Sequence, residues 1–174
     1  MNRTVRAYLP GTLATIRTLR DQRGLPPGVA YAVTPALRAE FGQADQEELE
    51  YEAFTQAAQA SLDLLRAEPS LPRRRVVIAV DVPARLLSAA PADRPRAALA
   101  DRPGAAPADR ADGPPAPTGR VALAGPVPLA AVVAIHLDSA AAAAEVAAVL
   151  AGAAEEVEYE LEWYDVSELD RLPG

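Results

Sequence analysis

The feature that most constrains the fold is a continuous apolar run near the middle of the chain, RRVVIAVDVP at residues 74–83. A strand with one face in water alternates apolar and polar residues, whereas a strand that is apolar at nearly every position is covered on both faces. The sequence therefore predicts a strand here, with other parts of the protein packed on each side of it.

The longest predicted helix runs from about Asp45 to Ala67. Asp45 and Glu48 have the spacing of a capping box at its start, and Pro69 ends it. Apolar residues at helical spacing predict one buried stripe along it, made of Tyr51, Phe54, Ala58, Leu62 and Leu65.

Two parts of the chain, residues 5–37 and 132–169, share the same order of strand, helix and second strand. Hydroxyl side chains stand where helices are expected to begin, at Thr12, Thr34 and Ser139. A right-handed crossover in each unit would make its two strands parallel. We therefore predict an α/β (α+β) fold with a single mixed sheet, helices packed on it and two strand–helix–strand units.

Residues 84–118 are rich in proline, alanine and arginine and contain a degraded octamer that repeats at Ala92, Ala100 and Ala108. Such a segment has too few large apolar side chains to offset the entropy lost on ordering. A strand pattern resumes at Val121. We predict one domain over residues 1–174, interrupted by a disordered insertion at 84–118.

Composition excludes several classes of function. The net charge of −7 argues against a nucleic-acid surface and against anionic membranes. The chain has no cysteine, which excludes disulfides and thiolate metal sites, and no apolar signal segment stands at its start. We expect a soluble cytoplasmic protein with no cofactor.

Several blocks of the sequence also resemble a known family. They are RAYLPGTL, AYAVTPALRAEF, EELEYEAFTQAAQASLDLL, RRVVIAVDVP, GPVPLAAVVAIHLD and ELEWYDVSEL, in this order along the chain. Together they resemble a family of short actinobacterial proteins of unknown function. The resemblance implies a bacterial cytoplasmic protein with a compact α/β fold, and it assigns no activity, cofactor or catalytic residue.

Three predicted strands end in an aspartate, at Asp81, Asp138 and Asp165. If the three strands ran in the same direction, the carboxylates would meet at one rim of the sheet, where Mg²⁺ finds the oxygen ligands it prefers. Such a site would support phosphoryl transfer or hydrolysis. Aspartate is also common at strand ends for turns and helix caps, so a structural role is the alternative.

His136, the only histidine, stands in AIHLDS at the end of an apolar strand. It is a candidate general base together with Asp138, which lies two residues on and therefore on the same strand face. The alternative is a half-buried imidazole hydrogen-bonded to that carboxylate. No serine in a G-x-S-x-G elbow accompanies it, so covalent hydrolysis is not expected.

The segment EYELEWYDVSEL at residues 158–169 alternates apolar and acidic residues as a half-buried strand does. Trp163 is expected on the buried side and Tyr164 among the acids. Tyr164, Glu162 and Glu160 are therefore a candidate interface for a basic protein partner, although acidic strand faces also protect against aggregation. The arginine run at 73–75 is expected to be a solvated strand entrance.

The function that these patterns favour is a non-catalytic protein-binding or regulatory domain with an unidentified protein partner. The alternative is a Mg²⁺-dependent phosphoryl-transfer or hydrolytic enzyme that uses the strand-end aspartates, with His136 as its base.

Overall fold

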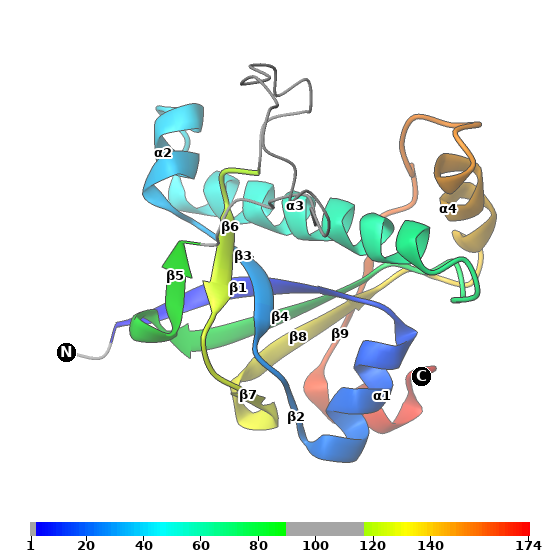
Figure 1. Ribbon diagram of the computed structural model, residues 1–174, viewed down its shortest axis with the longest axis horizontal. Coiled ribbons are helices and arrows are strands. Elements are labelled where there is room, and N and C mark those ends of the chain that lie inside the picture. The colour runs from blue at the N-terminus through cyan, green and yellow to red at the C-terminus, as the bar shows by residue number, and fades with distance from the viewer. Residues whose placement is uncertain (1–2, 90–116) are drawn as a thin grey trace, which may run out of the picture.

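The computed structural model describes residues 3–89 and 117–174 (Figure 1). Its helices are α1 (Leu13–Gln22), α2 (Pro35–Phe41), α3 (Gln46–Ala67), α4 (Ala143–Leu150) and the 3₁₀ helices η1 (Ala84–Leu86), η2 (Leu129–Ala131) and η3 (Val166–Arg171). Its strands are β1 (Thr4–Gly11), β2 (Gly24–Leu25), β3 (Gly28–Ala32), β4 (Val76–Pro83), β5 (Leu87–Ala89), β6 (Arg120–Leu123), β7 (Val127–Pro128), β8 (Val132–Leu137) and β9 (Glu162–Tyr164).

A seven-stranded sheet in the order β5-β6-β3-β1-β4-β8-β9 forms the middle of the molecule, and β2 pairs with β7 in a small second sheet. The prediction of an α/β fold with helices packed on a sheet is confirmed. The prediction of parallel strands within the two units is wrong, because β3 is antiparallel to β1 and β9 is antiparallel to β8.

The register explains this difference. Ala7 pairs with Ala32 and Tyr8 with Tyr31, so β3 begins beside the end of β1. Helix α1 and strand β2 thus leave the sheet and return to it at the same end, as a wide hairpin connection does. A crossover does occur, but between β3 and β4, which are both antiparallel to β1 and therefore parallel to each other on either side of it.

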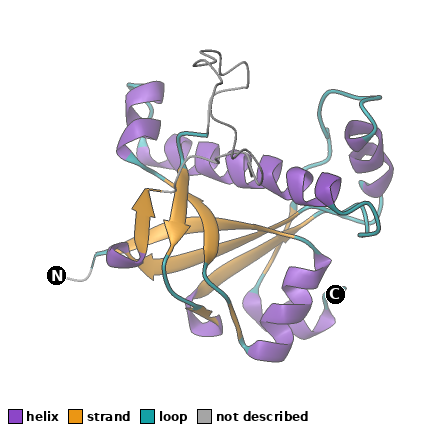
Figure 2. Ribbon diagram, in the orientation of Figure 1, coloured by secondary structure: helices purple, strands orange, loops and turns teal. Residues whose placement is uncertain are grey.

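Helices lie against both faces of the sheet (Figure 2). On one face, which we call the α1 face, buried strand residues pack with Ile16 and Leu19 of α1 and Leu169 of η3. On the opposite face, the α3 face, strand residues pack against Leu49, Ala53, Ala57 and Ala58 of α3. Strand β4 contributes to both clusters and is buried from Val76 to Val80, so its predicted burial on two sides is confirmed.

Helix α3 begins as the sequence predicts. The Asp45 carboxylate accepts hydrogen bonds from the backbone N–H groups of Glu47 and Glu48, and the Glu48 carboxylate accepts one from the Asp45 N–H. The predicted buried stripe is partly wrong, because the Tyr51 side chain is 68% exposed. The buried alanines Ala53, two residues after Tyr51, and Ala57, one turn further on, face the sheet instead and let the helix approach closely.

Of the predicted helix caps Thr34 and Ser139, only Thr34 caps a helix directly. Thr34 accepts a hydrogen bond from the Leu37 N–H at 3.0 Å and Pro35 follows at the first helical position, as expected. The Ser139 hydroxyl accepts one from the Ala142 N–H at 3.3 Å, before α4 begins at Ala143. Ser139 therefore caps a turn that precedes the helix.

The predicted insertion at 84–118 lies mostly outside the described residues, which omit 90–116. Its first residues belong to the fold, because 84–89 form η1 and β5 and β5 pairs with β6. Among the helices of the described ranges, none combines the length and the apolarity needed to cross a membrane.

Candidate functional site

The α3 face carries a groove of about 860 Å³, bounded by α3, by strands β1, β4 and β8, and by residues 156–163. Its lining is made of Arg6, Tyr8, Glu47, Glu50, Tyr51, Phe54, Thr55, Ala58, Arg75, Ala79, Val133, Ala134, His136, Glu156, Val157, Glu158, Tyr159, Glu160, Leu161 and Trp163.

A row of rings, which we call the aromatic track, runs across the groove from Tyr51 through Phe54 and His136 to Trp163. The Tyr51 and Phe54 rings are stacked with centroids 6.4 Å apart, and Phe54 meets His136 edge-on at 4.7 Å. Trp163 pairs with His136 across strands β9 and β8, which places the two side chains next to each other on the same face. The track ends in two exposed rings, because Tyr51 is 68% and Trp163 is 59% exposed.

The charge of the groove is negative. Five glutamates line it, and none of them forms an ion pair with another residue of the described ranges. The two arginines in the lining are each held by an aspartate, Arg6 by Asp81 and Arg75 by Asp138. The charged side chains of the lining that have no ion-pair partner among the described residues are therefore all carboxylates.

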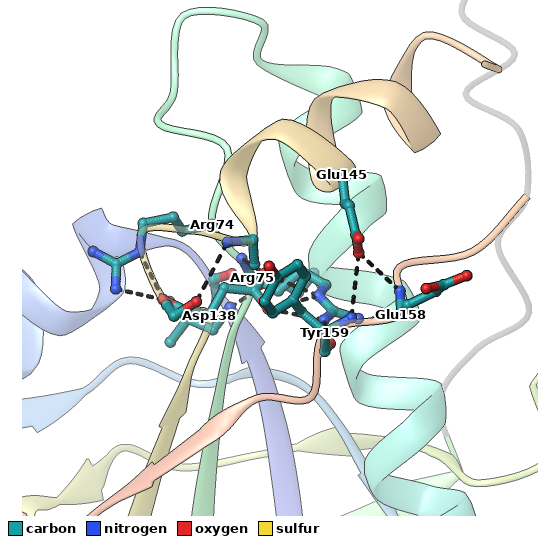
Figure 3. Close-up of polar contacts among 11 residues, drawn as sticks. Arg74, Arg75, Asp138, Glu145, Glu158 and Tyr159 are labelled. Atoms are coloured by element: carbon teal, nitrogen blue, oxygen red, sulfur yellow. Dashed lines mark hydrogen bonds and ion pairs between the residues drawn. The ribbon is translucent and has the colours of Figure 1, made fainter. Parts of the chain in front are cut away.

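The wall at residues 156–161 is fixed by Arg75 and Glu145 (Figure 3). The Arg75 guanidinium donates to the Tyr159 carbonyl oxygen at 2.7 Å, and the Glu145 carboxylate of α4 accepts from the N–H groups of Glu158 and Tyr159 at 3.0 and 3.3 Å. Arg75 is itself fixed by Asp138, whose carboxylate accepts from its Nη2 at 2.8 Å and its Nε at 2.9 Å. The groove thus has a preformed wall, held from inside the protein by the buried Arg75–Asp138 pair and at the surface by Glu145.

Residues 5–172 match a family of unknown function, DUF6912. The chain belongs to this family. The match covers the described sheet from the second residue of β1 onward and the groove from Arg6 to Trp163, which confirms the family resemblance seen in the sequence. Comparison with curated proteins and with solved structures gave no match.

In this DUF6912 chain, the three strand-end aspartates do not meet. The premise that their strands run in one direction is wrong, because β4 and β9 both run antiparallel to β8. Asp81 pairs with Arg6 and Asp138 with Arg75, while the Asp165 carboxylate accepts the Ser167 N–H and caps η3. Within residues 3–89 and 117–174, no group of three histidines or acids is placed to hold a metal ion.

His136 and Asp138 lie near each other in sequence but face different surroundings in the DUF6912 fold. The Asp138 carboxylate is completely buried with Arg75, whereas His136 lines the groove beside Phe54. Within the described part of the chain, no hydrogen bond joins His136 and Asp138, so the predicted dyad is not formed. Burial lowers the pKa of His136 below its ordinary value, which keeps the imidazole uncharged near neutral pH.

In this family member, Trp163 and the candidate interface residue Tyr164 each lie on the opposite side from the one expected. Trp163, expected in the core, is exposed in the groove, and Tyr164, expected among the acids, packs partly against the α1-face core. The Tyr164 hydroxyl donates to the Glu162 carboxylate at 2.5 Å, which raises the tyrosine pKa. Of the three residues Tyr164, Glu162 and Glu160, only Glu160 lines the groove.

Sequence reasoning missed two parts of the site, the rings of α3 and the buried Arg75. Arg75, expected in a solvated run, is 8% exposed. Its position directly before one apolar strand, with Asp138 directly after another, is the signal for the pair. Two antiparallel neighbours bring such positions together, and Val76 is indeed paired with Leu137.

Proposed function

We propose that this protein is a non-catalytic binding domain whose groove takes a basic segment of another protein. One observation is the basis of the proposal: two exposed rings, Tyr51 and Trp163, line a groove together with five glutamates that have no ion-pair partners among the described residues. A folded chain tends to bury its large aromatic side chains, so exposed rings beside a cavity are typical of a binding surface.

The chemistry of the groove supports a cationic partner. Aromatic residues are enriched at the centres of protein interfaces, and a negative surface attracts a positive segment and suppresses negative ones. The partner's cations would lie close to carboxylates and ring faces together, and both attract positive charge. The cytoplasmic location expected from the sequence belongs to the same proposal.

The only tryptophan of the chain stands in the groove and gives a direct assay. Short peptides of equal length with positive, neutral or negative side chains are titrated into the protein while the emission of Trp163 is followed. We expect the positive peptides to change the emission with saturation and to bind more weakly as salt is raised. The neutral and negative peptides should have no effect.

A matched pair of variants tests the place of binding. Glu47→Gln with Glu160→Gln removes two charges from the groove, whereas Asp21→Asn with Asp170→Asn removes two exposed charges from α1 and η3 on the opposite face. Affinity should fall only in the first variant. Equal losses in both would show that overall charge attracts the peptides, and no binding by any positive peptide up to about 1 mM would refute the proposal.

A further inference from the structure

We propose that the groove selects arginine, with the guanidinium group of the partner stacked on the aromatic track and bound to the glutamates beside it. This inference rests on the proposed function and names the chemical group that the groove recognises.

Geometry favours a flat cation. Tyr51 stacks on Phe54, and Phe54 meets His136 edge-on. Trp163 stands opposite His136 on the neighbouring strand, so its ring lies on the same side of the sheet as these three. A planar guanidinium stacks on such rings, whereas an ammonium group meets them as a compact point charge. The indole ring attracts cations more strongly than the other aromatic side chains, and Trp163 is one of the two most exposed rings of the track.

The carboxylates suit the same group. Glu47 and Glu50 stand on α3, on the same helix as Tyr51, and Glu158 and Glu160 stand on the wall formed by residues 156–161. A guanidinium has donors along its edge, so it can bind a carboxylate in its own plane while its face rests on a ring. An ammonium group has no flat face, so it cannot stack on a ring while it binds a carboxylate in this way.

The apolar part of the lining adds to the preference. Ala58, Val133 and Leu161 lie among the rings, so a cation that enters the groove loses part of its water. Guanidinium is more weakly hydrated than ammonium and loses less on entry. His136 is uncharged near neutral pH and adds no positive charge to oppose it.

The experiment compares two peptides of the same length, spacing and net charge, one with arginines and one with lysines in the same positions. Binding is measured by calorimetry, so that variants without Trp163 can be included. We expect the arginine peptide to bind about tenfold more tightly than the lysine peptide. Trp163→Leu and Tyr51→Leu should each remove most of this preference. Phe41→Leu, which changes an exposed ring outside the groove, should retain it.

Equal affinities of the two peptides would overturn the selection of arginine and leave the proposed function intact. Failure of both peptides to bind would overturn both proposals. A preference for arginine that persists in Trp163→Leu and Tyr51→Leu would overturn the placement on the aromatic track. Because both rings are exposed, circular dichroism of the two variants should show the fold of the unchanged protein.

Discussion

Replacement of Asp138 by alanine should strongly lower the stability of the fold, because it breaks a buried ion pair. The Asp138 residue is completely buried and the Arg75 side chain is 10% exposed. The carboxylate accepts hydrogen bonds from Arg75 Nη2, from Arg75 Nε and, at 2.7 Å, from the Arg75 backbone N–H. Asp138→Ala would leave a buried guanidinium without its counterion and a buried N–H without an acceptor.

Breaking a buried ion pair from one side costs about 3–5 kcal/mol of the free energy of unfolding. A protein of this size has about 5–15 kcal/mol in total, so the variant should remain folded only marginally. Its midpoint in urea should fall by about 2 M, for a loss of about 4 kcal/mol and a slope of about 2 kcal/mol/M. Far-ultraviolet circular dichroism with urea measures this directly.

Asp81→Ala is the matched control, because it also removes an aspartate from an arginine pair. The side chains of Arg6 and Asp81 are 33% and 40% exposed, so we expect a loss of less than about 1 kcal/mol. The double change Arg75→Met with Asp138→Leu should recover part of the stability that Asp138→Ala loses, since no charge is left buried. If Asp138→Ala were no more destabilising than Asp81→Ala, the buried pair would not support the fold as we argue.

Three further outcomes are expected. The folded-state pKa of His136 lies below that of the unfolded chain, so its contribution to stability is complete above about pH 6.5 and is lost as the pH falls. Urea titrations at several pH values should show that the free energy of unfolding depends less on pH in His136→Gln than in the unchanged protein. Ser61→Ala should cost about 1–3 kcal/mol in the same assay, because the buried Ser61 hydroxyl donates to the Gly11 carbonyl oxygen and accepts the Val76 N–H. Relative to their quenching of a free tryptophan amide at equal ionic strength, caesium ions should quench Trp163 more efficiently than iodide does, since the glutamates of the groove attract cations, and equal relative efficiencies of the two ions would contradict the negative potential.

Local signals in the sequence were reliable where one short-range interaction decides the structure. The start of α3 depends on Asp45 and Glu48 alone, and the burial of β4 depends on its own apolar residues; both were predicted correctly. The direction of neighbouring strands depends on where the chain returns to the sheet. That is a property of α1 and β2 together, and spacing in the sequence does not contain it.

The candidate site shows the same limit. The alternation at residues 158–164 was only partly predictive. Only Glu162–Tyr164 form a strand, and Leu161 packs partly on the α3 face, but Trp163, expected on the buried side, is exposed. What could not be predicted is that α3 leaves this edge of the face uncovered, so that Trp163 is exposed while Tyr164 packs toward the core. Periodicity tells which residues share a face, and only the packing of distant elements tells which face is buried.

The uneven cover of the sheet explains why the groove exists and why its occupant should be cationic. On the α1 face, η3 follows β9 directly and packs on β8, whereas on the α3 face the helix packs mainly on β1, β3 and β4. The edge formed by β8 and β9 is therefore open on that face. A segment that covered this edge would contact the groove lining, which includes five carboxylates and two exposed rings. An apolar segment would bury those carboxylates without partners at a cost of several kcal/mol, and an acidic one would be repelled. A segment that carries positive charge on side chains with apolar stems satisfies both demands.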